Sequence, residues 1–331
     1  MAVRVDDPAT PTQPAAVPDG VNSRPLTAVL RGYERFVRDI SAEWAGVSVR
    51  RFPNREVYVE VPAQVEGRHC IVVGSVSPSG TGLEDVTLVA HTLRRAGATR
   101  ITAVLPYLAY ARQDRADRSS SLGLGWVGAL LRASGVSDIV CVDVHSGIAG
   151  EVVGLPVRSL SPAGLLAGAL PQSWRREATF VAPDEGAIER CGAVARAAGS
   201  ELGMVWARKR RTTTGVEHLA LVGSPTEQAV VVDDILDTGA TLFSCCSQLR
   251  RAGVRRIGVL ATHGLFTGAR WRSLFSEGIE RIWITDTVLS RHRPSTATVV
   301  PVAPLLASAF DPTSHKLRAA SQAAMGEAGS T

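Results

Sequence analysis

The sequence has few aromatic residues, almost no lysine and no long hydrophobic run. Aromatic side chains make up 5% of the 331 residues, and the formal net charge of +5 is spread along the chain. A nucleic-acid surface would combine a basic stripe with stacking rings, so we expect anionic small molecules and no nucleic acid as ligands. No apolar run approaches the roughly 18 residues of a membrane span. The N-terminus lacks the apolar core of a secretory signal, so we expect a cytoplasmic protein without membrane contact.

Two further patterns that would fix a function are also missing. The cysteines form no CxxC pair and no cluster with histidine, so we expect buried reduced thiols and neither a zinc site nor a disulfide. They are Cys70, Cys141, Cys191, Cys245 and Cys246. No GxxxxGK[ST] sequence occurs, which excludes a P-loop kinase. Residues 123–128 spell GxGxxG, but a polar stretch precedes them instead of a strand, so they predict no dinucleotide site.

The chain alternates apolar, β-branched runs with helical segments rich in Ala, Leu and Arg. Such alternation predicts an α/β fold with mainly parallel sheets flanked by helices. LRRAGATRITAVLPYLAY (93–110) also lines up with LRRAGVRRIGVLATHGLF (249–266). We therefore predict two tandem duplicated domains, 25–158 and 159–311, between flexible tails at 1–24 and 312–331.

The stretch VVVDDILDTGATL (230–242) ends an apolar strand in carboxylates and continues into a small, hydroxyl-bearing loop. Its acids are Asp233, Asp234 and Asp237, and the loop continues through Thr238, Gly239, Ala240 and Thr241. Backbone N–H groups at a helix N-terminus, with threonine hydroxyls, make a phosphate cradle that small residues let the phosphate approach. The carboxylates suit sugar hydroxyls or Mg²⁺. Together they predict a pentose phosphate site.

This element resembles the phosphoribosyl-binding loop of type I phosphoribosyltransferases, a fold shared by enzymes that consume phosphoribosyl pyrophosphate and by synthetases that make it. Seven further motifs resemble those of ribose-phosphate diphosphokinases, the synthetases, in order and spacing from about residue 30 to 310. They are RFPNRE (51–56), PYLAYARQDR (106–115), VDVH (142–145), APDEG (182–186), KRR (209–211), ATHGLFTG (261–268) and ITDT (284–287). The chain is identified as a divergent member of that family, with two type I phosphoribosyltransferase-like domains.

The resemblance implies an Mg²⁺-dependent transfer of the diphosphoryl group of ATP to the C1 hydroxyl of ribose 5-phosphate, which gives phosphoribosyl pyrophosphate and AMP. It implies ATP binding by Phe52, Asn54, Glu56, Arg112 and Gln113, Mg²⁺ binding by His145 and Asp184, catalysis by Lys209 and Arg211, and ribose 5-phosphate binding by Asp233, Asp234 and the loop from Asp237 to Thr241. It also implies a homo-oligomer in which the hairpin at 51–56 reaches a neighbouring subunit, and a mobile lid at 212–218.

Two other functions stay open at this level. A phosphoribosyltransferase would consume the same diphosphate with one catalytic domain and a hood for a nucleobase. A catalytically silent relative would regulate a true synthetase, and Asn54-Arg55, where the family motif has Asp-Gly, keeps this alternative open. Retention of Lys209, one of only two lysines in the chain, favours an enzyme. His91 and His263 are interpreted as structural.

Overall fold

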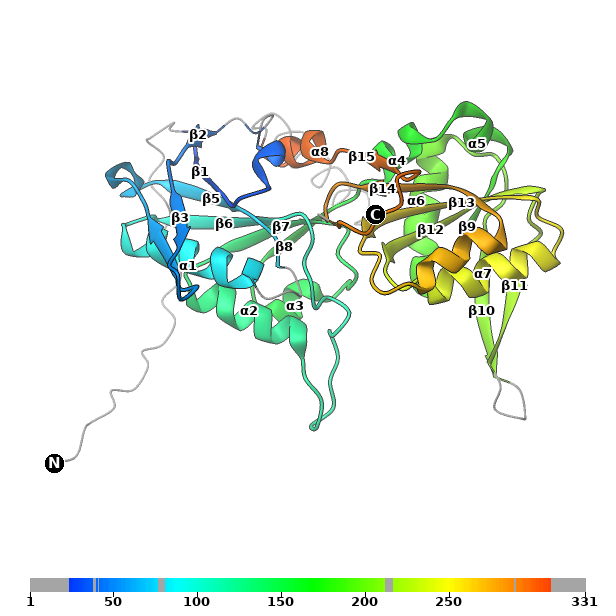
Figure 1. The fold of residues 1–331 in the computed structure, drawn as a ribbon, viewed down its shortest axis with the longest axis horizontal. Helices are drawn as coiled ribbons and strands as arrows, with labels where there is room; N and C mark the ends of the chain where they lie inside the picture. The colour runs from blue at the N-terminus through cyan, green and yellow to red at the C-terminus, as the bar shows by residue number, and fades with distance from the viewer. Residues whose placement is uncertain are drawn as a thin grey trace, which may run out of the picture.

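The computed structural model describes residues 24–37, 40, 42–76, 81–211, 217–288 and 290–310. They form two α/β units that lie side by side, each built around its own sheet (Figure 1). Residues 1–23 and 311–331, which hold nearly all of the predicted tails, lie outside the described residues.

The first sheet has six strands in the order β2-β1-β5-β6-β7-β8, and all neighbours are parallel. Its strands are β1 (Leu26–Val29), β2 (Glu43–Trp44), β5 (His69–Val73), β6 (Arg100–Leu105), β7 (Asp138–Val142) and β8 (Val157–Leu160). The helices of this half are α1 (Thr81–Arg95), α2 (Gly123–Ala133) and α3 (Ala149–Val153), with the short 3-10 helices η1 (Glu34–Phe36) and η2 (Ala63–Val65). A separate antiparallel hairpin joins β3 (Ser48–Arg51) to β4 (Val57–Glu60).

The second sheet has seven strands in the order β11-β10-β9-β12-β13-β14-β15, parallel except for the β10–β11 pair. Its strands are β9 (Thr179–Ala182), β10 (Val205–Arg211), β11 (Glu217–Val222), β12 (Gln228–Leu236), β13 (Arg256–Gly264), β14 (Ile279–Thr285) and β15 (Thr298–Val300). The remaining helices are α4 (Ala163–Ala169), α5 (Gln172–Glu177), η3 (Glu185–Ala187), α6 (Ile188–Ala198), α7 (Ala240–Arg251), η4 (Arg270–Glu277) and α8 (Ala303–Ser308).

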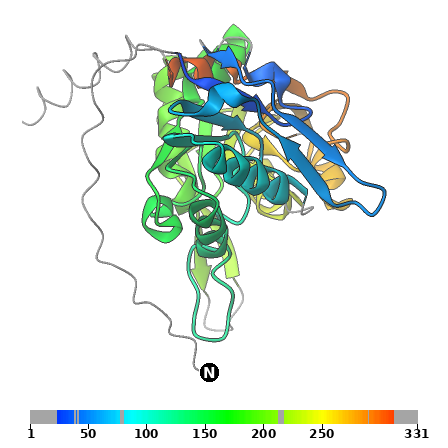
Figure 2. The same ribbon diagram turned by 90° about the vertical axis from the view of Figure 1, so that its left-hand side faces the viewer.

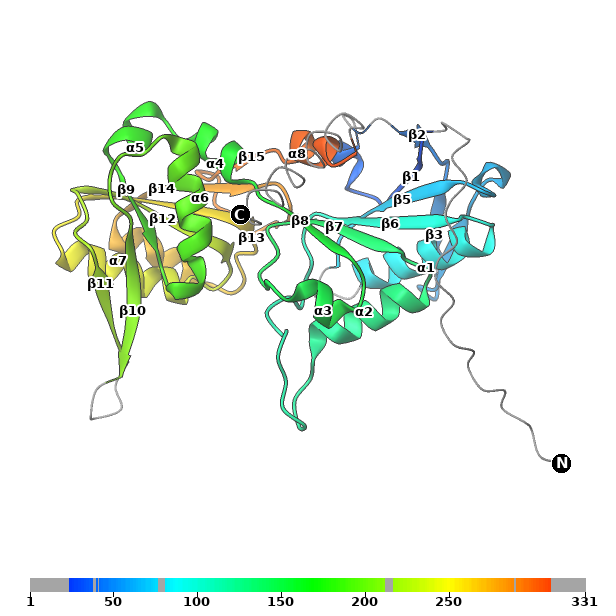
Figure 3. The same ribbon diagram turned by 180° about the vertical axis from the view of Figure 1, so that it is seen from behind.

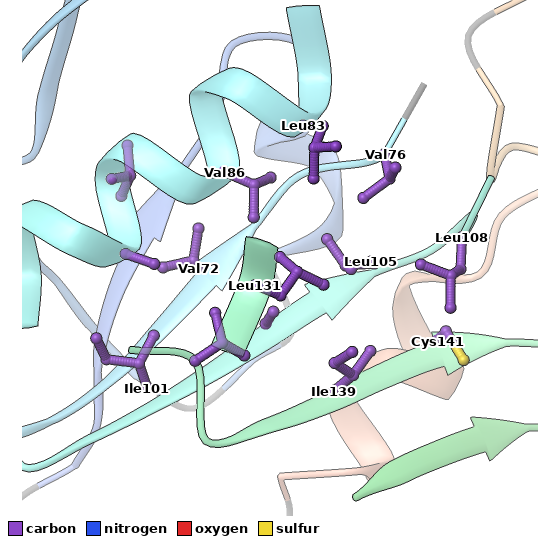
Figure 4. Packing of buried hydrophobic residues seen from close by; sticks show 14 of the residues in the cluster. Val72, Val76, Leu83, Val86, Ile101, Leu105, Leu108, Leu131, Ile139 and Cys141 are labelled. Carbon is purple, nitrogen blue, oxygen red and sulfur yellow. The ribbon is translucent and has the colours of Figure 1, made fainter. Parts of the chain in front are cut away.

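Each sheet buries apolar side chains on both faces, as the continuous apolar strands predict. Figure 4 shows Leu83 and Val86 of α1 packed over Val72, Ile101 and neighbouring strand residues. Helix α8 returns from the second sheet and covers the opposite face of the first, beside η1 (Figure 3). The α/β fold class is confirmed, while the domain boundaries at residues 158 and 311 stay predictions.

The repeated LRRAG segment ends two equivalent helices. In β5–α1–β6 the helix closes at Gly97 (φ 90°), and the amide of Ala98 donates to Leu93 O at 3.0 Å. In β12–α7–β13 it closes at Gly253 (φ 91°), and the amide of Val254 donates to Leu249 O at 3.0 Å. A left-handed residue at this position favours glycine, so the repeat encodes the same helix stop twice.

All five cysteines are buried and free, as predicted. Among the described residues, no helix is long and apolar enough to cross a membrane.

Candidate active site

The carboxyl ends of β7 and β12 meet between the two sheets and border a cavity of about 440 Å³. Parallel strands bring such ends to the edge where α/β proteins bind ligands. The cavity is lined by His145, Asp184, Glu185, Gly186, Ala187, Arg190, Ala207, Asp233 and Asp234. The predicted metal ligands and two of the predicted ribose residues therefore share one cavity, although they come from three different motifs.

His145 joins the two halves of this site. Its Nδ1 lies 2.5 Å from Oδ2 of Asp234, a carboxylate that is almost fully buried in β12. This hydrogen bond raises the pKa of His145, although partial burial works against the charged ring. Because Asp234 binds the ring through Nδ1, the same bond fixes the orientation of the imidazole.

The adjacent acids of β12 differ in the direction of their pKa shifts. Burial, and then the negative charge of Asp234, raise the pKa of Asp233 well above its usual range. Burial alone would also raise the pKa of Asp234, but the bond to His145 and the charge of Arg190 hold it below its usual range. The pair titrates as one unit, in which Asp234 carries the negative charge more readily.

The sequence misplaces the end of this strand. β12 continues two residues past the acids, because Ile235 and Leu236 still pair with His263 and Gly264 of β13. Asp233 and Asp234 therefore lie inside the strand and not beyond its end. Helix α7 begins at Ala240, so Ala240 and Thr241 belong to the helix and not to the loop that was predicted.

The loop before α7 borders a small cavity of about 70 Å³ that also reaches His145, Asp184 and Arg112. Its lining includes the whole predicted ribose-phosphate segment: Asp237, Thr238, Gly239, Ala240 and Thr241. Asp237 accepts a hydrogen bond from the hydroxyl of Thr267 and lies 3.4 Å from Nη1 of Arg112. The predicted ATP and ribose residues thus already touch across the two halves.

Arg112 and Gln113 line a second interdomain cavity of about 330 Å³, together with Tyr107, Tyr110, His145, Asp237 and His263 among others. Gln113 approaches α2 closely, because a Cβ at Gly123 would lie 2.5 Å from its Oε1. In this run, Gly123 permits the close approach of Gln113, and Gly128 permits that of the Val153 backbone. His263 is buried and pairs with Thr287 Oγ1 at 2.8 Å, a structural setting, whereas His91 is exposed on α1.

The hairpin residues predicted to bind ATP lie apart from this centre. Phe52, Asn54 and Glu56 sit in the turn between β3 and β4, on the side of the first unit remote from β12 (Figures 1 and 3). Arg51 holds the hairpin against α1 through Glu84, at 3.2 Å, and through Asp85. The ring of Phe52 is 51% exposed and contacts Tyr58.

Lys209 and Arg211 belong to β10, where they pair with Leu219 and Glu217 of β11. Of the predicted lid at 212–218, Glu217 and His218 belong to β11, and residues 212–216 lie outside the described residues. The hairpin and the loop that precedes α2 project from the same side of the molecule (Figures 1 and 2).

The donor set suits Mg²⁺ in part. Within the described residues, no group of three or more His, Cys, Asp and Glu side chains could hold a metal ion. The recorded bonds of His145 and Asp184 use Nδ1 and Oδ1, so Nε2 and the other carboxylate oxygen can serve as ligands. Mg²⁺ is usually bound through one or two carboxylates and completes its shell with water and substrate phosphates. The carboxylate of Asp184 fits that pattern, whereas the imidazole of His145, in the same cavity, is a ligand more typical of transition metals.

Several side chains at the site were not named from the sequence. Arg190 lies on α6, six residues after Asp184 of the APDEG motif. A helix that begins directly after this motif keeps its first turn close to it, and this spacing could have indicated that both residues line the same cavity. Thr262 and Thr267 fall inside the ATHGLFTG motif, which was noted without roles for either. Burial works against the charge of Arg190, but the carboxylates of Asp143 and Asp234 offset this and raise its pKa.

Comparison with known proteins covers both halves. Residues 33–135 match the N-terminal domain of ribose phosphate pyrophosphokinase, and residues 153–277 match the phosphoribosyl transferase domain. The chain is 32% identical to a ribose-phosphate pyrophosphokinase of Granulibacter bethesdensis, over 80% of this chain and 87% of that protein. It is 31% identical to the Corynebacterium efficiens protein of the same name, over 83% and 86%. The crystal structure of phosphoribosylpyrophosphate synthetase from Mycobacterium smegmatis matches with a TM-score of 0.76 and 26% identity, over 87% and 97%.

Proposed function

The chain belongs to the ribose-phosphate pyrophosphokinase family, and from this premise we propose that it transfers the diphosphoryl group of ATP to the C1 hydroxyl of ribose 5-phosphate. The products are 5-phosphoribosyl 1-diphosphate and AMP. One observation carries the assignment to these residues: His145 of the first unit lies 2.5 Å from Asp234 of the second, at the cavity that also holds Asp184 and Arg190.

The arrangement supports a division of the site between two substrates. The amides and hydroxyls at the start of α7 suit the 5-phosphate, and Asp233 and Asp234 suit the ribose hydroxyls. Arg112 and Gln113 in the second cavity suit the nucleotide, since a guanidinium binds phosphate oxygens and an amide binds polar ligand atoms. His145 lines all three cavities, so the reacting groups would meet beside it.

Phosphoryl-type transfer depends on positioning and on neutralising charge. His145 and Asp184 would hold Mg²⁺, which neutralises phosphate charge when it is bound. Lys209 and Arg211, on β10, would add positive charge to the transferring group from the second unit. The buried carboxylate of Asp234 would keep the His145 ring fixed through Nδ1.

We also propose that the enzyme is a homo-oligomer whose β3–β4 hairpin completes the nucleotide site of a neighbouring copy. The position of β3, remote from β12, and the half-exposed side chain of Phe52, the residue after β3, support this assignment. Exposed apolar side chains of the first unit suit a protein contact: Leu122, Trp126, Leu130 and Ile148. Trp126 lies beside the second cavity, because its ring contacts Tyr110, which lines that cavity, with 5.5 Å between the ring centroids.

The decisive assay incubates the protein with ATP, Mg²⁺ and ribose 5-phosphate and separates the products by chromatography and ³¹P NMR. We expect AMP and phosphoribosyl pyrophosphate in equal amounts, and ADP as the only nucleotide product would refute the transfer. A panel of nucleoside triphosphates and pentose phosphates defines the substrates. Lys209→Ala should lose activity, while Lys316→Ala, at the only other lysine, serves as the matched control.

A mixing experiment tests the hairpin. Phe52→Ala and His145→Ala chains are each expected to be nearly inactive. Co-expressed chains form mixed oligomers in which a normal hairpin meets a normal His145 in some sites. Activity well above the sum of the separate variants is expected, and activity no higher than that sum would contradict a hairpin acting between copies.

A further inference from the structure

Asp143, the residue that follows β7, is held in an unusual conformation. Its φ is 46°, in the left-handed region that a residue with a side chain rarely adopts. Its amide donates to Leu160 O at 3.0 Å, within the first unit. A backbone in this region persists only where its surroundings hold it there.

The groups that hold the rest of Asp143 come from the second unit. Nε of Arg190 donates to both carboxylate oxygens, at 2.9 and 2.8 Å, and the hydroxyl of Thr262 also donates to this carboxylate. Nε2 of His263 lies 3.3 Å from the Asp143 carbonyl oxygen. Side chains of helix α6 and strand β13 in the second unit thus surround Asp143 of the first unit.

Arg190 contacts a carboxylate of each unit. Its side chain is 17% exposed, and its Nη2 lies 3.9 Å from Oδ2 of Asp234, the carboxylate that also binds His145. The guanidinium is therefore engaged by carboxylates on two sides, one from each unit. Because these carboxylates occupy the guanidinium, we expect Arg190 to influence the substrate indirectly, through Asp143 and Asp234.

We propose that Arg190 is a positioning residue for the diphosphoryl transfer: by clamping Asp143 it holds His145, two residues later, against Asp234 and keeps both units in register around the shared cavity. The inference rests on the proposed function, because it assigns His145 to the reacting groups. Without the clamp, Asp143 relaxes toward an unstrained conformation and carries His145 with it. A displacement of about 1 Å in a reacting geometry costs up to about 100-fold in rate.

The chain offers a matched control for the clamp. Arg35 of η1 binds Asp286, which follows β14, with Nε at 2.9 Å from Oδ2. This arginine–aspartate pair also joins the two units, and its aspartate is as buried as Asp143, but its residues do not line the described cavities around His145. A purely structural role for Arg190 would make the two arginines equivalent.

The first measurement is steady-state kinetics of Arg190→Gln, Arg190→Lys and Arg35→Gln. We expect Arg190→Gln to lower kcat by about 100-fold with Michaelis constants close to wild type, because orientation is lost and substrate contacts remain. Arg190→Lys should keep only part of the wild-type kcat, since an ammonium does not reproduce the planar, multiple-donor geometry of the guanidinium. Arg35→Gln should keep the wild-type kcat. An equal loss in Arg35→Gln, an unchanged kcat in Arg190→Gln, or a loss confined to the Michaelis constant for ATP overturns the proposal.

The second measurement does not depend on catalysis. In ¹⁵N-labelled protein, the Nδ1 proton of His145 bonded to Asp234 should give a downfield NMR signal, assigned with His145→Gln. We expect Arg190→Gln to lose this signal and Arg35→Gln to keep it. An intact signal in folded Arg190→Gln refutes the positioning role even if the wild-type protein makes no phosphoribosyl pyrophosphate, whereas that lack of product would refute only the proposed function. Should Arg190→Gln fail to fold, the same signal is measured in Arg190→Lys, where we expect it to weaken or shift, and an unchanged signal refutes the positioning role.

Discussion

Replacing Gly239 by alanine tests the ribose-phosphate loop at the point where backbone and packing constrain it most. Gly239 precedes α7 with φ 80°, a conformation that costs alanine about 1 kcal/mol or slightly more. An added Cβ would also lie 3.1 Å from Cα of Trp271 and 3.2 Å from Cδ1 of Leu274. Both neighbours are buried in the core under α7, so neither can move away freely.

The two effects can be added for an expected magnitude. Overpacking of this kind costs typically about 1–3 kcal/mol, so the total loss of unfolding free energy is about 2–4 kcal/mol. This corresponds to a fall in Tm of roughly 5–15 °C for a protein of this size. The loop must also shift away from η4, which displaces the amides that we propose bind the 5-phosphate. We expect the Michaelis constant for ribose 5-phosphate to rise about tenfold, or about 1.4 kcal/mol, while that for ATP stays the same.

Gly253 provides the control at the other end of the same helix. It has φ 91°, and among the described residues no heavy atom lies within 4 Å of its ideal Cβ position. Gly253→Ala should therefore lose only the conformational part, about 1 kcal/mol or a Tm fall of about 2–4 °C, with unchanged kinetics. Scanning calorimetry and ribose 5-phosphate saturation curves measure both variants. Equal Tm values for the two variants, together with an unchanged Michaelis constant in Gly239→Ala, would refute the reasoning.

Three further predictions concern other parts of the molecule. Gly128→Ala places a Cβ 2.2 Å from the carbonyl oxygen of Val153, so calorimetry should show a loss of about 1–3 kcal/mol with little change in kcat at 25 °C. Thr267→Val removes the hydroxyl that donates to Asp237, and the Michaelis constant for ribose 5-phosphate should rise about tenfold, consistent with about 1.5 kcal/mol for a bond to a charged group; an unchanged constant would contradict the role of that bond. Burial lowers the pKa of His263 below its unfolded value of about 6.5, so its contribution to stability is fully present above that pH and is lost as pH falls through the folded pKa. Tm measured between pH 7.5 and 5.5 should accordingly fall more in the wild type than in His263→Gln, and parallel curves would exclude this histidine as a cause.

The family and the fold could be predicted from residues that are close in the sequence. Continuous apolar strands, the LRRAG helix stops at Gly97 and Gly253, and the acidic loop are local patterns whose physical causes act over a few residues. The boundaries were less exact, because pairing with β13 extends β12 two residues past Asp234 and α7 begins at Ala240, which shortens the predicted loop by two residues. Strand ends depend on the neighbouring strand, which no local pattern contains.

The tertiary structure alone decided which of these residues act together. Asp143 and Arg190 are 47 residues apart and His145 and Asp234 are 89 apart, yet each pair meets where the carboxyl ends of parallel strands from the two sheets converge. The sequence identified His145 and Asp234 as separate ligands, but it contained no sign that one orients the other. The family resemblance assigned Phe52 and Arg112 to one nucleotide site that the hairpin reaches from a neighbouring subunit, and within one chain the hairpin is held against α1, away from the cavity that Arg112 lines. Local chemistry therefore indicated the family and the class of ligand, and the packing of the two units determined the geometry in which the charges of the site meet.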